Sequence, residues 1–185
     1  PQGCADYAFQ QHIQKSLDLG NGRSISLWPH GILFRAAETD MRRKMIEEDQ
    51  VECVIGLGPN LFYNSPMEAC LLITKTNKEK SKQGKVLIIN AVKEVRQDTS
   101  VSFLENHHIE RIHNAYIAYQ NEDEFCKVVS IESVLAHNAS LNMALYVSNV
   151  DGSEEKVSLD DALSNWSKSA TQLATSMNEL LKELG

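Results

Sequence analysis

The fold class is decided by one stretch of this sequence, VECVIGLGPNLFYN at residues 51–64. Its first part, residues 51–56, is a nearly continuous apolar run, which predicts a strand buried on both faces of a sheet. A loop rich in proline, glycine and asparagine follows at 58–60. Phe62 and Tyr63 then lie just past the C-terminal end of the strand. Open α/β sheets bind ligands at that edge, so these two aromatic residues are candidates for a binding site.

Further elements are expected on both sides of this strand. Hydrophobic periodicity and turn residues predict a helix, a strand, a polar helix and, after the loop, two more strands, at residues 6–17, 23–28, 40–49, 69–75 and 85–91. This order is half of an open α/β sheet and not a complete domain. The missing strands would lie upstream, and the chain begins with Pro1, so we expect a piece of a longer protein.

The first helix is expected to bury one apolar face. Four apolar residues recur there at every fourth position: Ala5, Phe9, Ile13 and Leu17. Asp6 has the side chain of an N-cap, and a glycine-rich turn at 20–22 ends the helix.

Another helix is predicted in the second half of the chain. Ser102 and Glu105 have the spacing of a capping box. In such a box each side chain accepts a hydrogen bond from a backbone amide that has no partner within the helix. That helix is expected to run to about Tyr119. A short strand at 125–129 and a short helix at 131–136 follow.

The C-terminal segment shows the clearest helical repeat. Apolar residues are spaced alternately by four and three positions: Leu159, Leu163, Trp166, Ala170, Leu173, Met177, Leu180 and Leu184. We expect a linker and a long amphipathic helix at 151–185, after a sheet at 1–92 and an α/β extension at 93–150. The helix is expected to contact another chain or another part of the parent protein, the alternative being packing on its own domain.

Composition excludes several classes of function. The net charge of −7 argues against broad nucleic-acid binding, so any DNA contact must be local or supplied by a partner. There is no apolar run long enough to span a membrane and no signal peptide. The cysteines at 4, 53, 70 and 126 lack a metal-binding spacing and favour free thiols in a reducing cytoplasm.

Four segments, in order, carry a resemblance to a known family. They are Ala5-Asp6-Tyr7-Ala8-Phe9, Pro29-His30-Gly31-Ile32-Leu33-Phe34-Arg35, Val54-Ile55-Gly56-Leu57 with Asn60-Leu61-Phe62-Tyr63-Asn64, and Leu141-Asn142 before Tyr146-Val147. Together, over roughly residues 3–150, they resemble the C-terminal part of the modification subunit of type I restriction-modification systems.

The resemblance implies a Rossmann-like, cytoplasmic DNA methyltransferase that transfers a methyl group from S-adenosylmethionine to N6 of adenine. The family's glycine-containing donor loop and its Asn-Pro-Pro-Phe/Tyr motif do not occur in this sequence. We therefore expect the catalytic and donor-binding residues upstream, and a fragment that is inactive alone and binds no donor. The implied partners are DNA and the specificity and restriction subunits, with the terminal helix docking on the specificity subunit.

The resemblance also implies site residues. A flipped adenine needs an aromatic face to stack on, and Phe62 is the first candidate, with Tyr63 second. The alternative is that both aromatics only pin the loop to the core. Asn60 belongs to the same loop. His30 and Arg35 lie at the end of the strand expected to be the neighbour, where His30 could face the substrate or make a structural hydrogen bond, and Arg35 could contact a phosphate or an acidic residue.

Other polar clusters have simpler interpretations. His107, His108 and His113 lack the carboxylate or cysteine spacing of a metal site and favour a solvated helix. Lysines at 75, 78, 80, 82 and 85 could touch DNA, but a solvated connection is the favoured interpretation.

The sequence departs from the family pattern at three places. Residues 36–38 read Ala-Ala-Glu instead of Gly-Gly-Ala-Glu, residues 65–68 read Ser-Pro-Met-Glu instead of Thr-Gly-Ile-Pro, and residues 144–145 lack a usual arginine. The second departure leaves the shape of the loop beside Phe62 open.

Two rival functions stay open at this point. One is a non-catalytic module that assembles a complex through the C-terminal helix. The other is a Rossmann-type methylase that acts on RNA or protein. An Asn-Pro-Pro motif would distinguish a DNA adenine methylase from it, and this sequence does not contain that motif.

Overall fold

The computed structural model describes residues 5–63, 65–98 and 101–147, and, further on, residues 163, 166–169, 171, 176 and 177. The chain divides into two units, Pro1–Asn149 and Val150–Gly185. The described residues of the second unit are helical. Most of the expected terminal helix and its linker lie outside the described residues, so that helix and its interface stay predictions.

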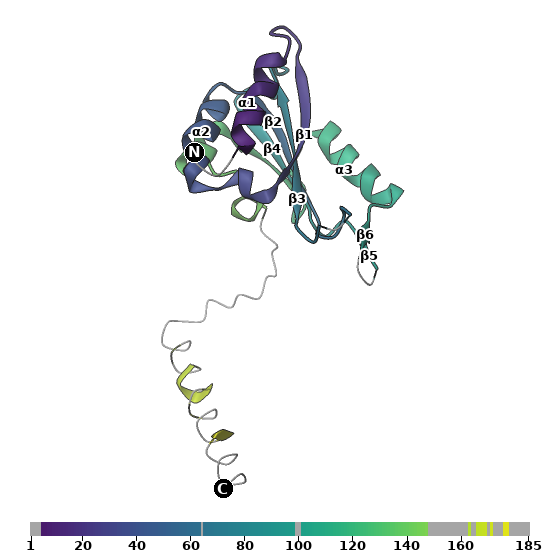
Figure 1. Cartoon of the computed structure of the whole chain (residues 1–185), viewed down its shortest axis with the longest axis vertical. Coiled ribbons are helices and arrows are strands. Elements are labelled where there is room, and N and C mark those ends of the chain that lie inside the picture. The colour runs from purple at the N-terminus through teal and green to yellow at the C-terminus, as the bar shows by residue number, and fades with distance from the viewer. Residues whose placement is uncertain are drawn as a thin grey trace. The chain divides into compact units, whose positions relative to one another are not determined.

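A five-stranded mixed sheet organises the first unit (Figure 1). Its strands, in spatial order, are β1 (Arg23–Pro29), β3 (Ala69–Lys75), β2 (Val51–Leu57), β4 (Lys85–Ala91) and β7 (Cys126–Ser130). Strands β2 and β4 are parallel, and the other neighbouring pairs are antiparallel. All residues of β2 are buried, as its apolar run predicts. The expected α/β fold is confirmed.

The expected neighbour relation of the first two strands is wrong. Strand β3 lies between β1 and β2 and pairs antiparallel with both. The chain leaves β2 through a loop and returns beside it, which is the short connection that an antiparallel pair allows. Strand β1 therefore lies two positions from β2, although both run in the same direction.

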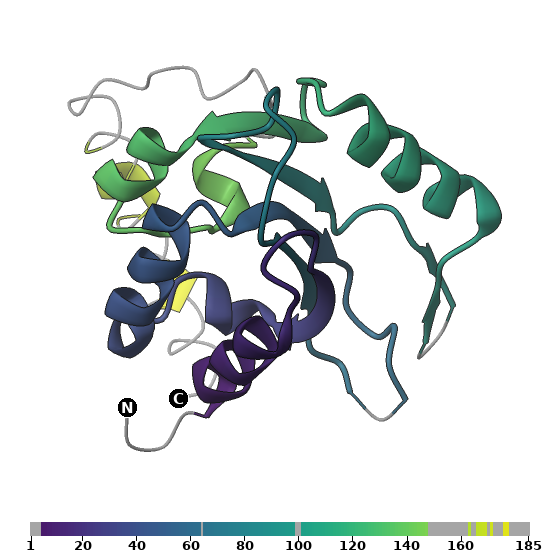
Figure 2. The same ribbon diagram turned by 90° about the horizontal axis from the view of Figure 1, so that it is seen from above.

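Helices cover the two faces of the sheet unequally (Figure 2). One face carries several elements: α1 (Asp6–Ser16), α2 (Thr39–Glu47), α4 (Ile131–Ala136) and the 3-10 turns η1 (His30–Leu33), η2 (Ala36–Glu38) and η3 (Met143–Leu145). The other face carries α3 (Asn106–Ala118). A two-stranded hairpin, β5 (Arg96–Gln97) and β6 (Ser102–Phe103), connects β4 to α3. None of the helices in the described part of the chain has the length and hydropathy needed to cross a membrane.

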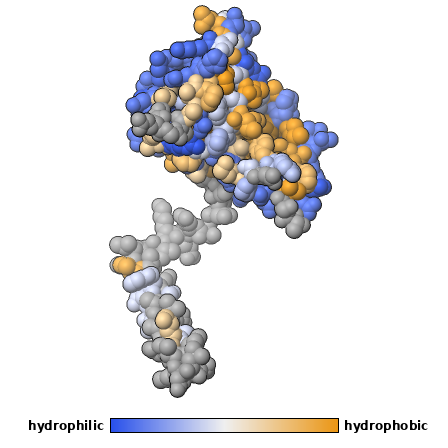
Figure 3. Space-filling model, viewed as in Figure 1, coloured by the Kyte–Doolittle hydropathy of each residue, from blue (hydrophilic) through white to orange (hydrophobic). Residues whose placement is uncertain are grey.

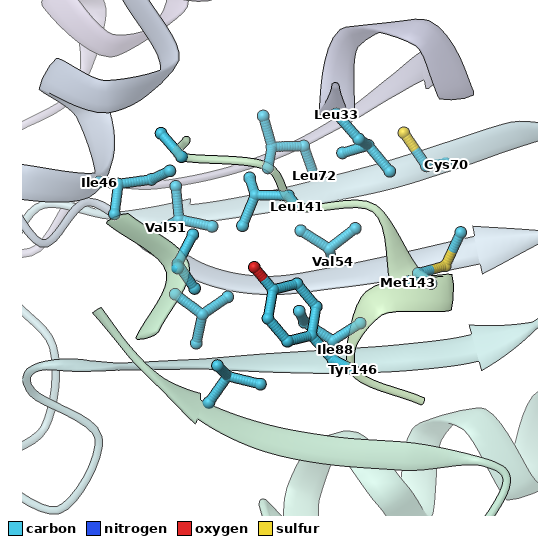
Figure 4. Packing of buried hydrophobic residues seen from close by; sticks show 14 of the residues in the cluster. Leu33, Ile46, Val51, Val54, Cys70, Leu72, Ile88, Leu141, Met143 and Tyr146 are labelled. Atoms are coloured by element: carbon cyan, nitrogen blue, oxygen red, sulfur yellow. The ribbon is translucent and has the colours of Figure 1, made fainter. Parts of the chain in front are cut away.

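Side chains from both sheet and helices form the core on the α1 side (Figure 4). Val54 and Leu72 of the central strands pack there with Ile46 of α2 and with Leu141 and Tyr146 near the end of the unit. The described cysteines Cys53, Cys70 and Cys126 are buried free thiols, as expected, whereas Cys4 lies outside the described residues.

Helix α1 buries a different face from the expected one. Tyr7 and Gln10 are its buried residues, while Phe9 is 63% exposed. The Tyr7 hydroxyl donates to the Ile32 carbonyl oxygen at 3.2 Å, and Oε1 of Gln10 accepts from Trp28 of β1 at 2.9 Å. These polar contacts decide which face of the helix is buried, and the apolar repeat does not. The N-cap is Ala5 and not Asp6, and it makes no side-chain cap hydrogen bond.

The expected capping box of α3 is also displaced. The N-cap is Glu105, and the box pairs it with His108, whose Nδ1 accepts from the Glu105 amide at 3.1 Å. Ser102 lies in β6, and its amide donates to the Asn60 carbonyl oxygen at 2.8 Å. Because this contact holds Ser102 in the hairpin, the helix starts one turn later than the sequence predicts.

A buried arginine joins α2 to two distant segments. Arg42 is 1% exposed, and its guanidinium donates to the carbonyl oxygens of Ala139 at 2.6 Å, Ile32 at 3.2 Å and Arg35 at 3.2 Å. Arginine suits this position because its planar group offers five donors in fixed directions. It fixes the backbone of η1 and of the segment that precedes η3.

We expect Arg42→Ala to lower the free energy of unfolding by about 3–5 kcal/mol, because the carbonyl oxygens of Ala139, Ile32 and Arg35 each lose a charged donor. Urea unfolding followed by circular dichroism measures this change. Lys44→Ala on the same helix, where the side chain is 72% exposed, is the control and should change stability by less than about 0.5 kcal/mol. A loss below about 1 kcal/mol for Arg42→Ala would contradict this role.

A second polar cluster fastens α3 to the start of β2. The carboxylate of the buried Glu52 accepts from the Tyr116 hydroxyl at 2.7 Å and from Lys82 at 3.2 Å. Burial alone would raise the pKa of Glu52, but these hydrogen bonds and the charge of Lys82 hold it below its usual range. Lys78 is buried nearby and pairs with Asp49 at 2.5 Å. The favoured interpretation of a solvated lysine-rich connection is therefore wrong for these two lysines, which are structural.

Tyr116→Phe should show how stability depends on the Glu52 carboxylate. A carboxylate whose pKa is lower in the folded than in the unfolded state stabilises the protein at pH values above the ordinary glutamate pKa. This stabilisation is lost as the pH falls through the pKa of the folded state. We expect the variant to lose about 1–2 kcal/mol at pH 7 and less at pH 4. Urea unfolding at both pH values tests this. Tyr63→Phe, at an exposed tyrosine, is the control, and an equal loss at both pH values would argue against the role of the carboxylate.

Candidate functional site

Three strands end at one rim of the sheet. Strands β1, β2 and β4 run in the same direction, and their last residues, Pro29, Leu57 and Ala91, lie in one row with Ala69, where β3 begins. The segments that follow these strands therefore emerge side by side. The first two of these segments were predicted from the sequence to lie at one edge.

A close backbone approach holds two of these segments together. A Cβ atom at Gly58, just after β2, would lie 2.6 Å from the carbonyl oxygen of Val92, just after β4. No larger residue fits without moving the backbone, since real Cβ contacts are essentially never that short. The hydrogen bond from Ser102 to Asn60 adds the β5–β6 hairpin to the same group.

The loop from Gly58 to Glu68 presents its two aromatic residues differently. Asn60 has φ of 58°, a left-handed conformation that asparagine tolerates. Phe62 is half-buried and packs on the core beneath α3, and its carbonyl oxygen accepts from the Ser65 amide at 3.0 Å. Tyr63 is 92% exposed. The first of the two pins the loop, and the second projects from it.

His30 lies beneath the rim. Its Nδ1 is 3.0 Å from a carboxylate oxygen of Glu68, at the other end of the loop after β2. Its Nε2 is buried near Gly56 and has no hydrogen-bond partner within the ranges that the structure describes. The contact with Glu68 ties η1 to the loop, which corresponds to the structural alternative for His30.

Arg35 is held by acidic neighbours. Its guanidinium donates to Asp6 of α1 at 2.6 Å and lies 3.5 Å from the buried carboxylate of Glu38. Of the two alternatives that the sequence left open, the structure shows the acidic neighbour. These contacts join α1 to the turns after β1.

The four segments quoted from the sequence meet in space. Tyr7 of the first contacts Ile32 of the second, and the Leu141 amide of the fourth donates to the Leu33 carbonyl oxygen at 2.9 Å. Gly56, in the third segment, lies against Met143, between the two parts of the fourth, so closely that a Cβ atom would clash with the Met143 sulfur. Segments far apart in the chain thus support one rim.

Comparison with known proteins assigns this arrangement. The model of the N-6 DNA Methylase family matches residues 1–155. This chain belongs to that family. Its resemblance to the methylase subunits of type I restriction enzymes, expected from the sequence, is confirmed.

Individual members of the family agree over most of the chain. It is 35% identical over 158 residues to the type I restriction enzyme MjaVIII methylase subunit of Methanocaldococcus jannaschii, covering 83% of this chain and 27% of that protein. The HindI methylase subunit of Haemophilus influenzae is 26% identical over 174 residues, covering 89% of this chain and 39% of that protein. The chain thus spans between a quarter and two fifths of these relatives.

Solved structures show the same fold. The type I methyltransferase subunit of Streptococcus thermophilus superposes with a TM-score of 0.75 at 34% identity, covering 80% of this chain and 31% of that one. The M protein of the EcoKI enzyme superposes with a TM-score of 0.63 at 16% identity, covering 98% of this chain and 44% of that one, a likeness of fold alone.

Some parts of the site in this methylase chain were not expected from sequence. The β5–β6 hairpin was missed because its strands are two residues each, too short for any alternation. Its Arg96 lies over the Phe103 ring at 5.3 Å and pairs with Glu105 at 2.8 Å. Within the described ranges no cluster of three or more histidine, cysteine or acidic residues could hold a metal ion.

The two aromatic residues should differ in their effect on folding. We expect Phe62→Ala to lower the free energy of unfolding by about 1–2 kcal/mol, because the ring loses its partial burial. Tyr63→Ala should change it by less than about 0.5 kcal/mol. Urea unfolding of the two variants provides the comparison. Equal effects would show that the loop packs differently from this description.

Proposed function

We propose that this chain forms one wall of the adenine-binding cleft of a type I methylase subunit, which transfers a methyl group from S-adenosylmethionine to N6 of adenine in DNA. The supporting observation is the rim itself, where three loops from co-directional strands meet and one of them projects a free aromatic ring. Open α/β sheets bind their ligands at this edge. Membership of the N-6 DNA methylase family supports the choice of reaction.

Tyr63 is the better candidate for contact with the extruded base. A methylase must take its adenine out of the duplex, and an aromatic face in the site stabilises the swung-out purine by about 1–3 kcal/mol. The ring of Tyr63 is exposed, whereas Phe62 is committed in part to the core. We therefore assign stacking to Tyr63 and support of the loop to Phe62, which reverses the order expected from sequence. Asn60 contributes a left-handed backbone conformation to this loop.

His30 and Arg35 act as positioning residues in this proposal. The His30–Glu68 contact joins the ends of two rim segments, and Arg35 joins α1 to the turns after β1. Neither guanidinium nor imidazole needs to touch DNA for these functions. Glu68 itself belongs to one of the stretches that depart from the family pattern, so this tie is a property of the present sequence.

The methyl donor and the catalytic motif are assigned to parts of the subunit outside this chain. The sequence holds no Asn-Pro-Pro motif and no glycine-rich turn between a strand and a helix, so its residues do not fit a donor site. The chain alone is then inactive. DNA and the specificity and restriction subunits are the proposed partners, which agrees with the acidic net charge of −7 because others would supply most phosphate contacts.

Activity of a complete methylase subunit that carries this chain tests the assignment. We expect Tyr63→Ala to reduce kcat/KM for adenine methylation by about 5- to 100-fold, through loss of stacking. Tyr63→Phe keeps the ring and should retain activity within about threefold. Fluorescence of 2-aminopurine at the target position reports base extrusion directly. Full activity and full extrusion with Tyr63→Ala would exclude this residue from the pocket.

A further inference from the structure

Positive charge at the rim is concentrated in one of its three segments. Residues 58–68, after β2, contain no lysine or arginine, and residues 30–38, after β1, contain Arg35, whose guanidinium is held by two carboxylates. The segment after β4 carries Lys93, which is exposed, and Arg96 of β5, whose side chain is 60% exposed. The lysine and arginine side chains most open to a ligand at the rim therefore belong to the segment that forms the β5–β6 hairpin.

The hairpin is fastened beside the loop that carries Tyr63. The Ser102 amide of β6 donates to the Asn60 carbonyl oxygen at 2.8 Å. Arg96 lies opposite Phe103, the residue after Ser102, in the two-stranded ladder. Tyr63 follows Asn60 by three residues, which is at most about 11 Å of extended chain. Two adjoining segments of the same rim thus carry the guanidinium and the exposed aromatic ring.

Two contacts fix the direction of the Arg96 side chain. Its guanidinium lies over the Phe103 ring at 5.3 Å, and its Nη1 donates to Oε1 of Glu105 at 2.8 Å. The Glu105 carboxylate also accepts from the His108 amide, as the cap of α3, so it is itself held in place. A guanidinium has five N–H donors in fixed directions, and donors remain for a ligand. Arg96 is therefore preorganised for binding.

The surroundings of Arg96 suit a phosphate of a nucleic acid. Glu94 pairs with Arg111 at 2.6 Å, and Asp98 lies in the turn at the tip of the hairpin. Figure 3 shows hydrophobic residues gathered on the side of the molecule that carries α3 and the hairpin, and the Phe103 ring is 44% exposed. Arginine stacked on an aromatic ring is a side chain that proteins use to bind phosphate and nucleic acids.

We propose that Arg96 binds a phosphate of the DNA strand from which the target adenine is extruded, close to that base. The inference rests on the proposed function, which makes DNA the substrate of this rim. A phosphate contact positions the duplex and carries no sequence information. The hairpin thus holds the strand in register while Tyr63 receives the base. This single contact is local, as the net charge of −7 requires.

The salt dependence of DNA binding tests the contact. The complete methylase subunit that carries this chain, assembled with the proposed specificity subunit, is titrated with a labelled duplex between about 50 and 200 mM salt. We expect Arg96→Gln to weaken binding by about tenfold and to reduce the slope of log Kd against log salt by about 0.9, the value for one phosphate contact. Arg96→Lys keeps the charge and should retain the slope.

Lys80→Gln is the matched control for the loss of one positive charge. Lys80 is exposed and lies between β3 and β4, at the edge of the sheet opposite the rim. This variant should leave both the affinity and the slope unchanged. An unchanged slope with Arg96→Gln, or an equal change with Lys80→Gln, would overturn the proposal.

A double-mutant cycle locates the phosphate. Each phosphate beside the target adenine is replaced in turn by an uncharged methylphosphonate. At one position this change should weaken the unsubstituted complex by about tenfold and the Arg96→Gln complex by less than about twofold, because both changes remove the same contact. Additive effects at every position would contradict the proposal.

Base extrusion, read from 2-aminopurine fluorescence, separates this contact from the role given to Tyr63. A reduced slope with Arg96→Gln together with full extrusion by Tyr63→Ala would support the hairpin contact and remove Tyr63 from the pocket. An unchanged slope with Arg96→Gln together with lost extrusion by Tyr63→Ala would reject the hairpin contact and leave the adenine pocket intact.

Discussion

All seven residues of β2 are buried, so the centre of the sheet must be covered on both faces. On one face α1, α2, α4 and the 3-10 turns do this, and they close the core around Val54. On the other face α3 covers only part of the sheet. Both the stability of the unit and its partly open face follow from this inequality. The need to bury the central strand therefore accounts for the complete helix layer on one face of the sheet and for the incomplete layer on the other.

The rim is held in place by contacts with residues from other parts of the chain. The Arg42 guanidinium and the Leu141 amide both donate hydrogen bonds to carbonyl oxygens of η1. The loop after β2 is held at its base by Gly58 against Val92 and at its end by Glu68 against His30. Both ends of the loop are thus fixed, while the Tyr63 ring that it carries is exposed. Under the proposed function, these supports preorganise the loop for binding.

Local patterns made the strands and the family resemblance predictable. The apolar run of β2 and the turn residues beside it need no tertiary information, and these strands are where the sequence places them. The sheet order was not predictable, because pairing of Pro29 with Ala69 is a contact between distant segments. The buried face of α1 was missed because hydrogen bonds of Tyr7 and Gln10 outweigh its apolar repeat. Likewise, composition made Lys78 look solvated, and only the fold brings Asp49 to it.

The insertion of β3 between two earlier strands affects how the chain is made. Strands β1 and β2 have no ladder in common, so among the described strands neither gains a partner until residues 69–75 have left the ribosome. Until then a nascent chain carries two apolar strands with open edges, the species most prone to aggregate. Helices α1 and α2 form from local contacts and are available earlier to shield one side. Assembly of the sheet is thus a late, cooperative event during translation, and a product that stops before β3 has no native sheet to join.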